Sequence, residues 1–461
     1  MRRFVFPAVL FTFIIILIAI GGNAPGNDTS TTDSGSPVTP GSTGSVNDIV
    51  LLKPEVLTHF PAEAPAPDKP ILRWTIPPGS VYFEIEFLDA YPENPNDIRP
   101  SVHRFFASRE VFTNGYSVNL SQYKDDLLYW RVRALDLDGN PVGVFSDATP
   151  IYIDHNLPNI LKPVANTGYN AAKMQMPLYP VYSWIPIYGA VAYELELTNA
   201  PPENPDGTSP SQYQIRMYAV NGPYDYYFAY YDQVALSTPG TYYWRVRGLD
   251  KAGGPVGVFS DAERFTVSRE AGNYAATFGD STTQGGGDMI YSPANVESDY
   301  RYYLKFPTMN LGKSADNAAG MLARFENDVL PFHPQFLIIL GGIPELTEDV
   351  PAAQVIDELA AIRDRCRLNG IRPIFLTLYP VNPANIKRTA NHDTVSDWEE
   401  KFAQVNTFLR KQKYCIDIEP YFQGADHNLP SYLSADGIHL GIEGKKRMGQ
   451  VINDNWLRVT Q

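Results

Sequence analysis

The N-terminal part of the chain contains an internal repeat, and a repeated segment is expected to fold twice into the same unit. Each copy alternates apolar and polar residues in short runs, which are separated by turn residues. The recurring motifs are Glu84-Ile85-Glu86-Phe87 with Glu194-Leu195-Glu196-Leu197, and Tyr129-Trp130-Arg131-Val132-Arg133 with Tyr243-Trp244-Arg245-Val246-Arg247. Such alternation predicts an antiparallel β-sandwich for each copy. We assign residues 48–156 to the first sandwich and residues 157–269 to the second.

The Trp early in each copy, the Tyr-Trp-Arg-Val-Arg strand and the trailing Phe-Ser-Asp resemble those of fibronectin type III modules. The second copy is also rich in tyrosine: Tyr213, Tyr218, Tyr224, Tyr226, Tyr227, Tyr230 and Tyr231. Exposed aromatic side chains can bind sugars, so one interpretation is that the repeats contact glycan or cell wall. The other interpretation is that these tyrosines fill the sandwich core and its edges.

The overall composition limits the classes of partner. The 461 residues suffice for two or three domains. The formal net charge of −14 argues against nucleic acid, because a polyanion would be repelled. Cys366 and Cys415 are too few for a disulfide scaffold or a zinc cluster, and we predict no metal site. The two cysteines could pair in an exported protein, but we favour two separate buried thiols.

The N-terminus resembles a targeting segment. Met1-Arg2-Arg3 precedes an apolar run from Phe4 to Ile20, and a positive start before an apolar run indicates an export signal. Small residues suitable for cleavage end at Ala24, but Pro25 directly follows and would hinder cleavage.

We therefore predict that residues 1–24 are either a signal peptide or an N-terminal membrane anchor. Residues 25–47, which are rich in Ser, Thr, Gly and Pro, are expected to form a disordered linker. The protein would then be exported, either secreted or anchored facing the extracellular or periplasmic side. Only the N-terminal segment would touch the membrane.

From residue 273 the pattern changes to strands that alternate with helices, as in a parallel sheet with helices on both faces. The predicted strands are Ala275–Gly279, Phe306–Leu311, Phe336–Gly341, Pro373–Leu378 and Tyr414–Ile418. One predicted helix has Val355, Leu359, Ile362 and Cys366 at helical spacing, and another follows a capping box at Ser396-Asp397-Trp398-Glu399. Ligands of such sheets bind at the carboxyl ends of the strands.

A hydroxyl, an imidazole and a carboxylate fall at two such positions. The first strand ends in Phe278-Gly279-Asp280-Ser281, and Asp436-Gly437-Ile438-His439 lies near the C-terminus. A serine becomes a useful nucleophile when a base removes its proton, and an acid can orient that base. The alternative for Asp436 and His439 is a turn at a helix start, with the Asp as a cap and the His solvated.

Together these two motifs resemble the SGNH/GDSL hydrolase family over residues 273–461. The resemblance implies a three-layer αβα domain of flavodoxin-like type that hydrolyses esters without a cofactor. It assigns Ser281 as the nucleophile, His439 as the general base and Asp436 as the acid. The predicted fold is thus two all-β sandwich repeats followed by an α/β hydrolase domain.

Two further blocks carry the oxyanion hole that the resemblance implies. Asn310-Leu311-Gly312-Lys313-Ser314-Ala315-Asp316 places Ala315 where the family has a glycine. The backbone N–H groups of Ser281 and Ala315 are the expected donors, with Gly312 as the alternative to Ala315.

The third block departs from the family pattern. In Gly341-Gly342-Ile343-Pro344-Glu345, Pro344 replaces an asparagine whose side chain is an oxyanion donor, and proline has no N–H. The enzyme could be slower, could recruit Asn317 or Gln284 as a donor, or could be inactive. We assign Asp280, Gly342 and Glu345 to substrate binding.

These observations predict an exported serine esterase that acts on small esters or on O-acetyl and short acyl groups of cell-surface or extracellular carbohydrate. The alternative is a non-catalytic surface protein that binds glycan or protein and carries a degenerate hydrolase domain. A peptidase with the same triad is a third reading, which the family resemblance disfavours.

Overall fold

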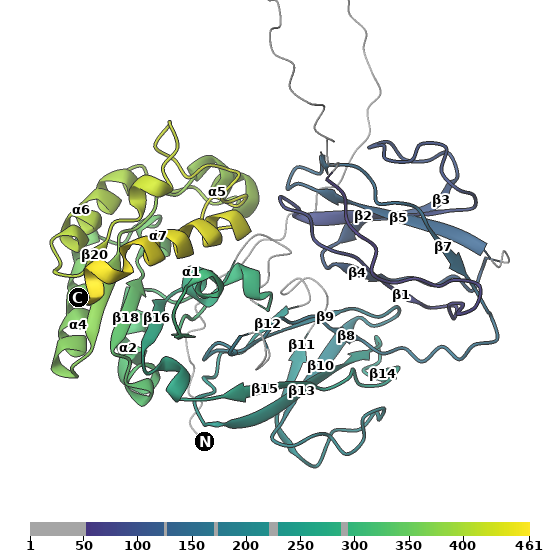
Figure 1. Cartoon of the computed structure of the whole chain (residues 1–461), viewed down its shortest axis with the longest axis horizontal. Coiled ribbons are helices and arrows are strands. Elements are labelled where there is room, and N and C mark those ends of the chain that lie inside the picture. The colour runs from purple at the N-terminus through teal and green to yellow at the C-terminus, as the bar shows by residue number, and fades with distance from the viewer. Residues whose placement is uncertain (1–51, 124–126, 170–173, 221–228, 287–293) are drawn as a thin grey trace, which may run out of the picture. The chain divides into compact units, whose positions relative to one another are not determined.

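The computed structural model describes residues 52–123, 127–169, 174–220, 229–286 and 294–461 (Figure 1). The predicted signal or anchor at residues 1–24 and the linker at residues 25–47 lie outside this part of the chain, as do Tyr224, Tyr226 and Tyr227. Within the described residues, none of the helices has the length and apolar character needed to cross a membrane.

The two repeats form antiparallel β-sheets with the same order of strands. The strands of the first repeat are β1 (Ile71–Arg73), β2 (Tyr82–Leu88), β3 (Arg104–Val111), β4 (Gly115–Ser117), β5 (Leu127–Leu135), β6 (Pro141–Val142) and β7 (Thr149–Tyr152). Those of the second are β8 (Val164–Ala165), β9 (Val181–Ile185), β10 (Ala192–Thr198), β11 (Gln214–Val220), β12 (Ala229–Tyr231), β13 (Gly240–Leu249), β14 (Pro255–Val256) and β15 (Glu263–Val267). The order β3-β2-β5-β6, with β7 on β5, recurs as β11-β10-β13-β14, with β15 on β13. The predicted all-β repeats are therefore confirmed as antiparallel sheets, and their likeness to fibronectin type III modules stays a prediction.

Each repeat has its own hydrophobic core. Trp74 and Trp130 are buried in the first core, and Trp184 and Trp244 are buried in the second. In the second repeat the hydroxyl of Tyr218 bonds to buried Asp232, which fits a structural use of this tyrosine, whereas Tyr213 is exposed.

The repeated glutamates and arginines form buried cross-strand ion pairs. Glu86 lies opposite Arg131, and Glu196 lies opposite Arg245. Arg131 Nε is 2.7 Å from Glu86 Oε1, and Arg245 Nε is 2.6 Å from Glu196 Oε2. Because both partners are buried, the charge of one group compensates that of the other. The recurrence of charged residues in these strands is thus explained by pairing within the sheet.

We predict that Glu196→Gln lowers the free energy of unfolding by about 3–5 kcal/mol, because it leaves the buried charge of Arg245 without its counter-charge. Urea unfolding followed by tryptophan fluorescence would measure the change. As the control, Asp393→Asn removes one partner of the exposed pair with Lys387, and it should cost about 1 kcal/mol or less. Equal effects of the two substitutions would contradict the prediction.

The C-terminal domain is built on a five-stranded parallel sheet, as predicted. Its strands are β16 (Ala275–Gly279), β17 (Thr308–Asn310), β18 (Phe336–Leu340), β19 (Arg372–Leu376) and β20 (Cys415–Ile416), in the order β17-β16-β18-β19-β20. The edge strands β17 and β20 are shorter than the predicted runs. The order places β17 and β18 on opposite sides of β16, so the chain changes direction across the sheet at β16.

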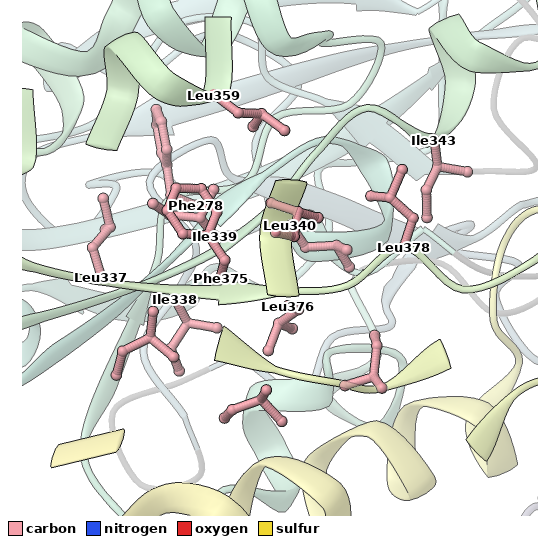
Figure 2. Close-up of a cluster of buried hydrophobic side chains, with 14 of the residues drawn as sticks. Phe278, Leu337, Ile338, Ile339, Leu340, Ile343, Leu359, Phe375, Leu376 and Leu378 are labelled. Atoms are coloured by element: carbon pink, nitrogen blue, oxygen red, sulfur yellow. The ribbon is translucent and has the colours of Figure 1, made fainter. Parts of the chain in front are cut away.

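Helices pack on the sheet of this domain. They are α1 (Ser281–Gln284), α2 (Ala318–Asp328), α3 (Ile343–Leu346), α4 (Ala352–Leu368), α5 (Pro383–Ala390), α6 (Trp398–Arg410) and α7 (Ile442–Thr460), with short 3₁₀ turns η1 (Glu270–Gly272), η2 (Val296–Ser298), η3 (Tyr300–Tyr303), η4 (Leu330–Phe332) and η5 (Glu419–Tyr421). Helix α4 contacts both α2 and α6, whereas α7 contacts η2, η3 and β20. Figure 2 shows Leu359 of α4 on one side of the strands, while the yellow α7 lies on the other side. This is the expected three-layer arrangement.

Two local predictions have different outcomes. The predicted stripe of α4, which includes Leu359 and Cys366, is buried, and both cysteines are free and buried, as favoured. The capping box before α6 is wrong: Asp397 is the N-cap residue and its side chain makes no capping hydrogen bond. The helix itself is present, because its apolar stripe packs against the core and does not need the cap.

Candidate active site

Ser281 lies at the carboxyl end of β16, the position at which ligands of such sheets bind. It is the first residue of α1, and Asp280 caps this short helix by accepting the N–H of Thr282 at 2.9 Å. Gly279 closes the strand, where an added Cβ would lie 2.1 Å from the carbonyl oxygen of Leu340. The tight turn between strand and helix therefore depends on this glycine.

The structure brings the three predicted catalytic residues together in one hydrogen-bond chain. Ser281 Oγ lies 2.8 Å from His439 Nε2, and His439 Nδ1 lies 2.7 Å from Asp436 Oδ2. The other oxygen of Asp436 accepts the backbone N–H groups of Ile438 and His439, each at 2.8 Å. Helix α7 begins later, with Gly441 as its N-cap. The alternative in which Asp436 caps a helix and His439 is solvated is therefore not what the structure has.

The electrostatics of the pair favour a charged imidazole. Burial acts to lower the pKa of His439, but the adjacent carboxylate of Asp436 outweighs burial and raises this pKa above its ordinary value of 6.5. Burial likewise acts to raise the pKa of Asp436, while the charge and hydrogen bonds of His439 hold it below 3.8. Asp436 thus stabilises the imidazolium that forms when His439 takes a proton.

Two residues that sequence reasoning missed hold the serine and histidine segments together. The hydroxyl of Tyr379 donates to the carbonyl oxygen of Ile438 at 2.8 Å and lies 2.9 Å from Thr282 Oγ1. Gly286 lies close to Ser281 and His439, since an added Cβ would lie 3.3 Å from His439 Cδ2 and 3.4 Å from Ser281 Cβ. The only sequence signal for Tyr379 was its place just after a predicted strand.

Backbone N–H groups near Ser281 are available for an oxyanion. Within the described residues, the N–H groups of Ser281 and Ala315 have no acceptor. Ala315 has φ of 62°, a left-handed conformation that explains why glycine suits this position. The N–H of Gly312 already donates to Asn310 Oδ1 at 2.8 Å, so Ala315 is the better candidate of the two.

The two donors that could replace the missing asparagine differ in availability. Both ends of the Gln284 amide are used: Nε2 donates to the carbonyl oxygen of Tyr179 at 2.9 Å, and Oε1 accepts the N–H of Ser314 at 2.6 Å. Asn317 is exposed and uses its side-chain oxygen to cap α2. The amide nitrogen of Asn317 is therefore the freer of the two donors.

The three residues assigned to substrate binding are buried. The pKa of Asp280 is raised by burial to about 6, and that of Glu345 is raised by burial to about 7. Glu345 Oε1 accepts the N–H of Ala318 at 2.8 Å, at the start of α2. Gly342 has φ of 112° and is the N-cap residue of α3, whose second residue is Pro344. In this structure the three residues support the loops, and a role in substrate binding stays a prediction.

Metal ligation has no candidate among the residues that the structure describes, which include no group of three or more His, Cys, Asp or Glu side chains placed to hold an ion.

Comparison with known proteins identifies the domain that carries this site. Residues 277–447 match the GDSL-like Lipase/Acylhydrolase family. The C-terminal region is therefore a GDSL-like lipase/acylhydrolase domain, a class whose members are typically carboxylic ester hydrolases. No curated protein matches the chain.

The solved structures that are similar to this chain include three bacterial proteins. A GDSL-like lipase from Bacteroides thetaiotaomicron is 17% identical, with a TM-score of 0.32, over 41% of this chain and 90% of its own. A lipase/acylhydrolase from Enterococcus faecalis is 20% identical, with a TM-score of 0.33, over 41% and 97%. A catalytic mutant of an acetylxylan esterase from Geobacillus stearothermophilus is 15% identical, with a TM-score of 0.31, over 41% and 93%.

We predict that the pKa of His439, measured by NMR titration of its ring protons, lies above 6.5 and falls in Asp436→Asn. The neutral amide no longer stabilises the imidazolium, so the charged form is lost at a lower pH. Asp364→Asn removes an exposed carboxylate on α4 and serves as the control. An unchanged pKa of His439 in Asp436→Asn would contradict the assigned pairing.

Proposed function

We propose that this protein is an exported serine esterase that removes O-acetyl or other short acyl groups from cell-surface or extracellular carbohydrate. The observation that carries the esterase assignment is the hydrogen-bond chain from Ser281 through His439 to Asp436, together with the N–H groups of Ser281 and Ala315, which have no acceptor in the described part of the chain. Nucleophile, base, orienting acid and oxyanion donors are the parts that acyl transfer requires.

The proposed reaction has two steps. His439 Nε2 takes the proton of Ser281 as Oγ attacks the ester carbonyl carbon, and the N–H groups of Ser281 and Ala315 bind the resulting oxyanion. His439 then gives the proton to the leaving alcohol as its C–O bond breaks, which leaves an acyl group on Ser281. Water attacks the acyl-enzyme, His439 takes the water proton, and that proton returns to Ser281 as the acid leaves.

The carbohydrate substrate and the export are supported by the sequence. The apolar N-terminal segment, the polar linker and the two β repeats are an arrangement suited to hold an enzyme near a surface polymer. No nucleic acid partner is expected at a net charge of −14.

Pro344 favours a second candidate function, a non-catalytic surface protein that binds glycan or protein. Loss of one oxyanion donor costs about a hundred- to a thousandfold in turnover. In this reading the β repeats bind the partner and the hydrolase domain is degenerate. The intact chain of Ser281, His439 and Asp436 favours the esterase.

The esterase is tested with p-nitrophenyl acetate and p-nitrophenyl esters of longer acyl chains. We expect turnover of the acetate by the wild type, and loss of that turnover in Ser281→Ala, because the variant lacks the nucleophile. The rate should decline as the pH falls through the raised pKa of His439, since the protonated imidazole cannot act as a base. Thr407→Ala, which removes an exposed hydroxyl on α6, is the matched control. Equal rates for the wild type and Ser281→Ala would refute the proposal.

The cost of Pro344 can be measured directly. We predict that Pro344→Asn raises kcat by up to about a hundredfold, because it restores a side-chain donor. Pro344→Ala removes the proline ring without adding a donor, and it should leave kcat near the wild-type value. A kcat that rises equally in both variants would show that backbone freedom, and not the amide, limits the rate.

A further inference from the structure

Tyr179 lies outside the region that matches the family, yet it belongs to the hydrophobic core of the hydrolase domain. It precedes β9 of the second repeat and, with Leu178, packs among the buried residues of that core. The N–H of Leu178 donates to the carbonyl oxygen of Asn310 at 2.9 Å. Asn310 ends β17, the edge strand of the parallel sheet, so one main-chain hydrogen bond joins this short segment to the edge of the sheet.

The backbone of Tyr179 is connected by hydrogen bonds, through the side chain of Gln284, to the loop that carries Ala315. Its carbonyl oxygen accepts Nε2 of Gln284, the last residue of α1, and Oε1 of the same amide accepts the N–H of Ser314. Gln284 is buried, so its two hydrogen bonds are not exchanged with water. Ser314 directly precedes Ala315. One amide group therefore connects Tyr179 with the proposed oxyanion donor.

The side chain of Tyr179 is connected to the same loop by a second series of hydrogen bonds, through Asp328 and Arg324. Its hydroxyl donates to Asp328 Oδ2 at 2.7 Å, and this oxygen also accepts Arg324 Nη1 at 2.9 Å. Arg324 in turn donates to the carbonyl oxygens of Leu311 at 2.7 Å and Gly279 at 2.9 Å. These carbonyls stand at the starts of the loops that carry Ala315 and Ser281. The guanidinium thus fixes the spacing between the two loops.

We infer that Tyr179 is a positioning residue for the oxyanion hole, and that the segment between β8 and β9 of the second repeat takes part in the function of the esterase. This inference rests on the proposed function. Among the described residues, no hydrogen bond joins Tyr179 directly to Ser281 or Ala315. It acts through Gln284 and through Asp328 and Arg324, which together set where the N–H groups of Ser281 and Ala315 point. Donors in an oxyanion hole are effective only when they are held in place before the reaction.

Two substitutions in the full chain test the two routes separately. Tyr179→Phe removes the hydroxyl that donates to Asp328 and keeps the ring. Gln284→Glu keeps an acceptor for the N–H of Ser314 but has no proton to donate to the carbonyl oxygen of Tyr179. The matched control is Tyr182→Phe on β9, which removes a buried tyrosine hydroxyl that has no hydrogen-bond partner among the residues that the structure describes. Two quantities are measured: kcat and KM for p-nitrophenyl acetate, and hydrogen exchange of the backbone of residues 311–317.

We expect kcat to fall about tenfold or more in each test variant while KM stays within about twofold, because small displacements of catalytic groups are costly in rate. Exchange in residues 311–317 should become faster in both variants. Tyr182→Phe should change neither quantity. Wild-type kcat and wild-type exchange in both test variants would overturn the inference, and so would an equal loss in Tyr182→Phe. If the wild type hydrolyses no ester, the proposed function fails, and the exchange measurement still decides whether Tyr179 holds the loop.

Discussion

The parallel pairing of β16 with β17 and β18 is the constraint on which the site depends. Because parallel strands end at the same edge of a sheet, the turn with Ser281, the loop with Ala315 and the turn with Pro344 meet there. Their positions are set by main-chain hydrogen bonds and by glycines that allow close approach. The two polar side chains that complete the chain, His439 and Asp436, come from a separate loop that Tyr379 ties to α1.

The hydrogen-bonded group of Ser281, His439 and Asp436 could be predicted from the sequence, because its members combine a distinctive spacing with side chains of complementary chemistry. The contacts of Tyr379, Gln284 and Arg324 could not, because each of these side chains bonds to a backbone carbonyl of a residue far away in the chain. A carbonyl has no side-chain identity, so such a contact leaves no pattern in a single sequence. The choice between Ala315 and Gly312 as oxyanion donor could not be made from the sequence for a similar reason. It depended on which of the two N–H groups already had an acceptor, and that contact is visible only in the structure.

The sequence predicted which strands and helices the chain forms. The errors concern strand ends and a helix cap, which depend on packing between segments and not on the local sequence pattern. The strands of the parallel sheet followed from buried apolar runs, although their ends depended on pairing that the sequence does not encode locally. The repeat revealed two equivalent β units, but not the reason that Glu and Arg recur in them. That reason is the register that places Glu86 opposite Arg131 and Glu196 opposite Arg245.

The hydrogen bond between Leu178 and Asn310 also affects where the boundary of the hydrolase domain should be drawn. An uncovered edge strand exposes N–H and C=O groups that can pair with another chain, and proteins commonly cover such edges. Here Leu178, almost a hundred residues before the hydrolase domain in the sequence, donates its N–H to the last carbonyl of the edge strand β17. A boundary drawn from family resemblance alone would separate the strand from this hydrogen bond and would remove Leu178 and Tyr179 from the core of the hydrolase domain. The smallest unit that can be moved intact to another protein would therefore include the second repeat.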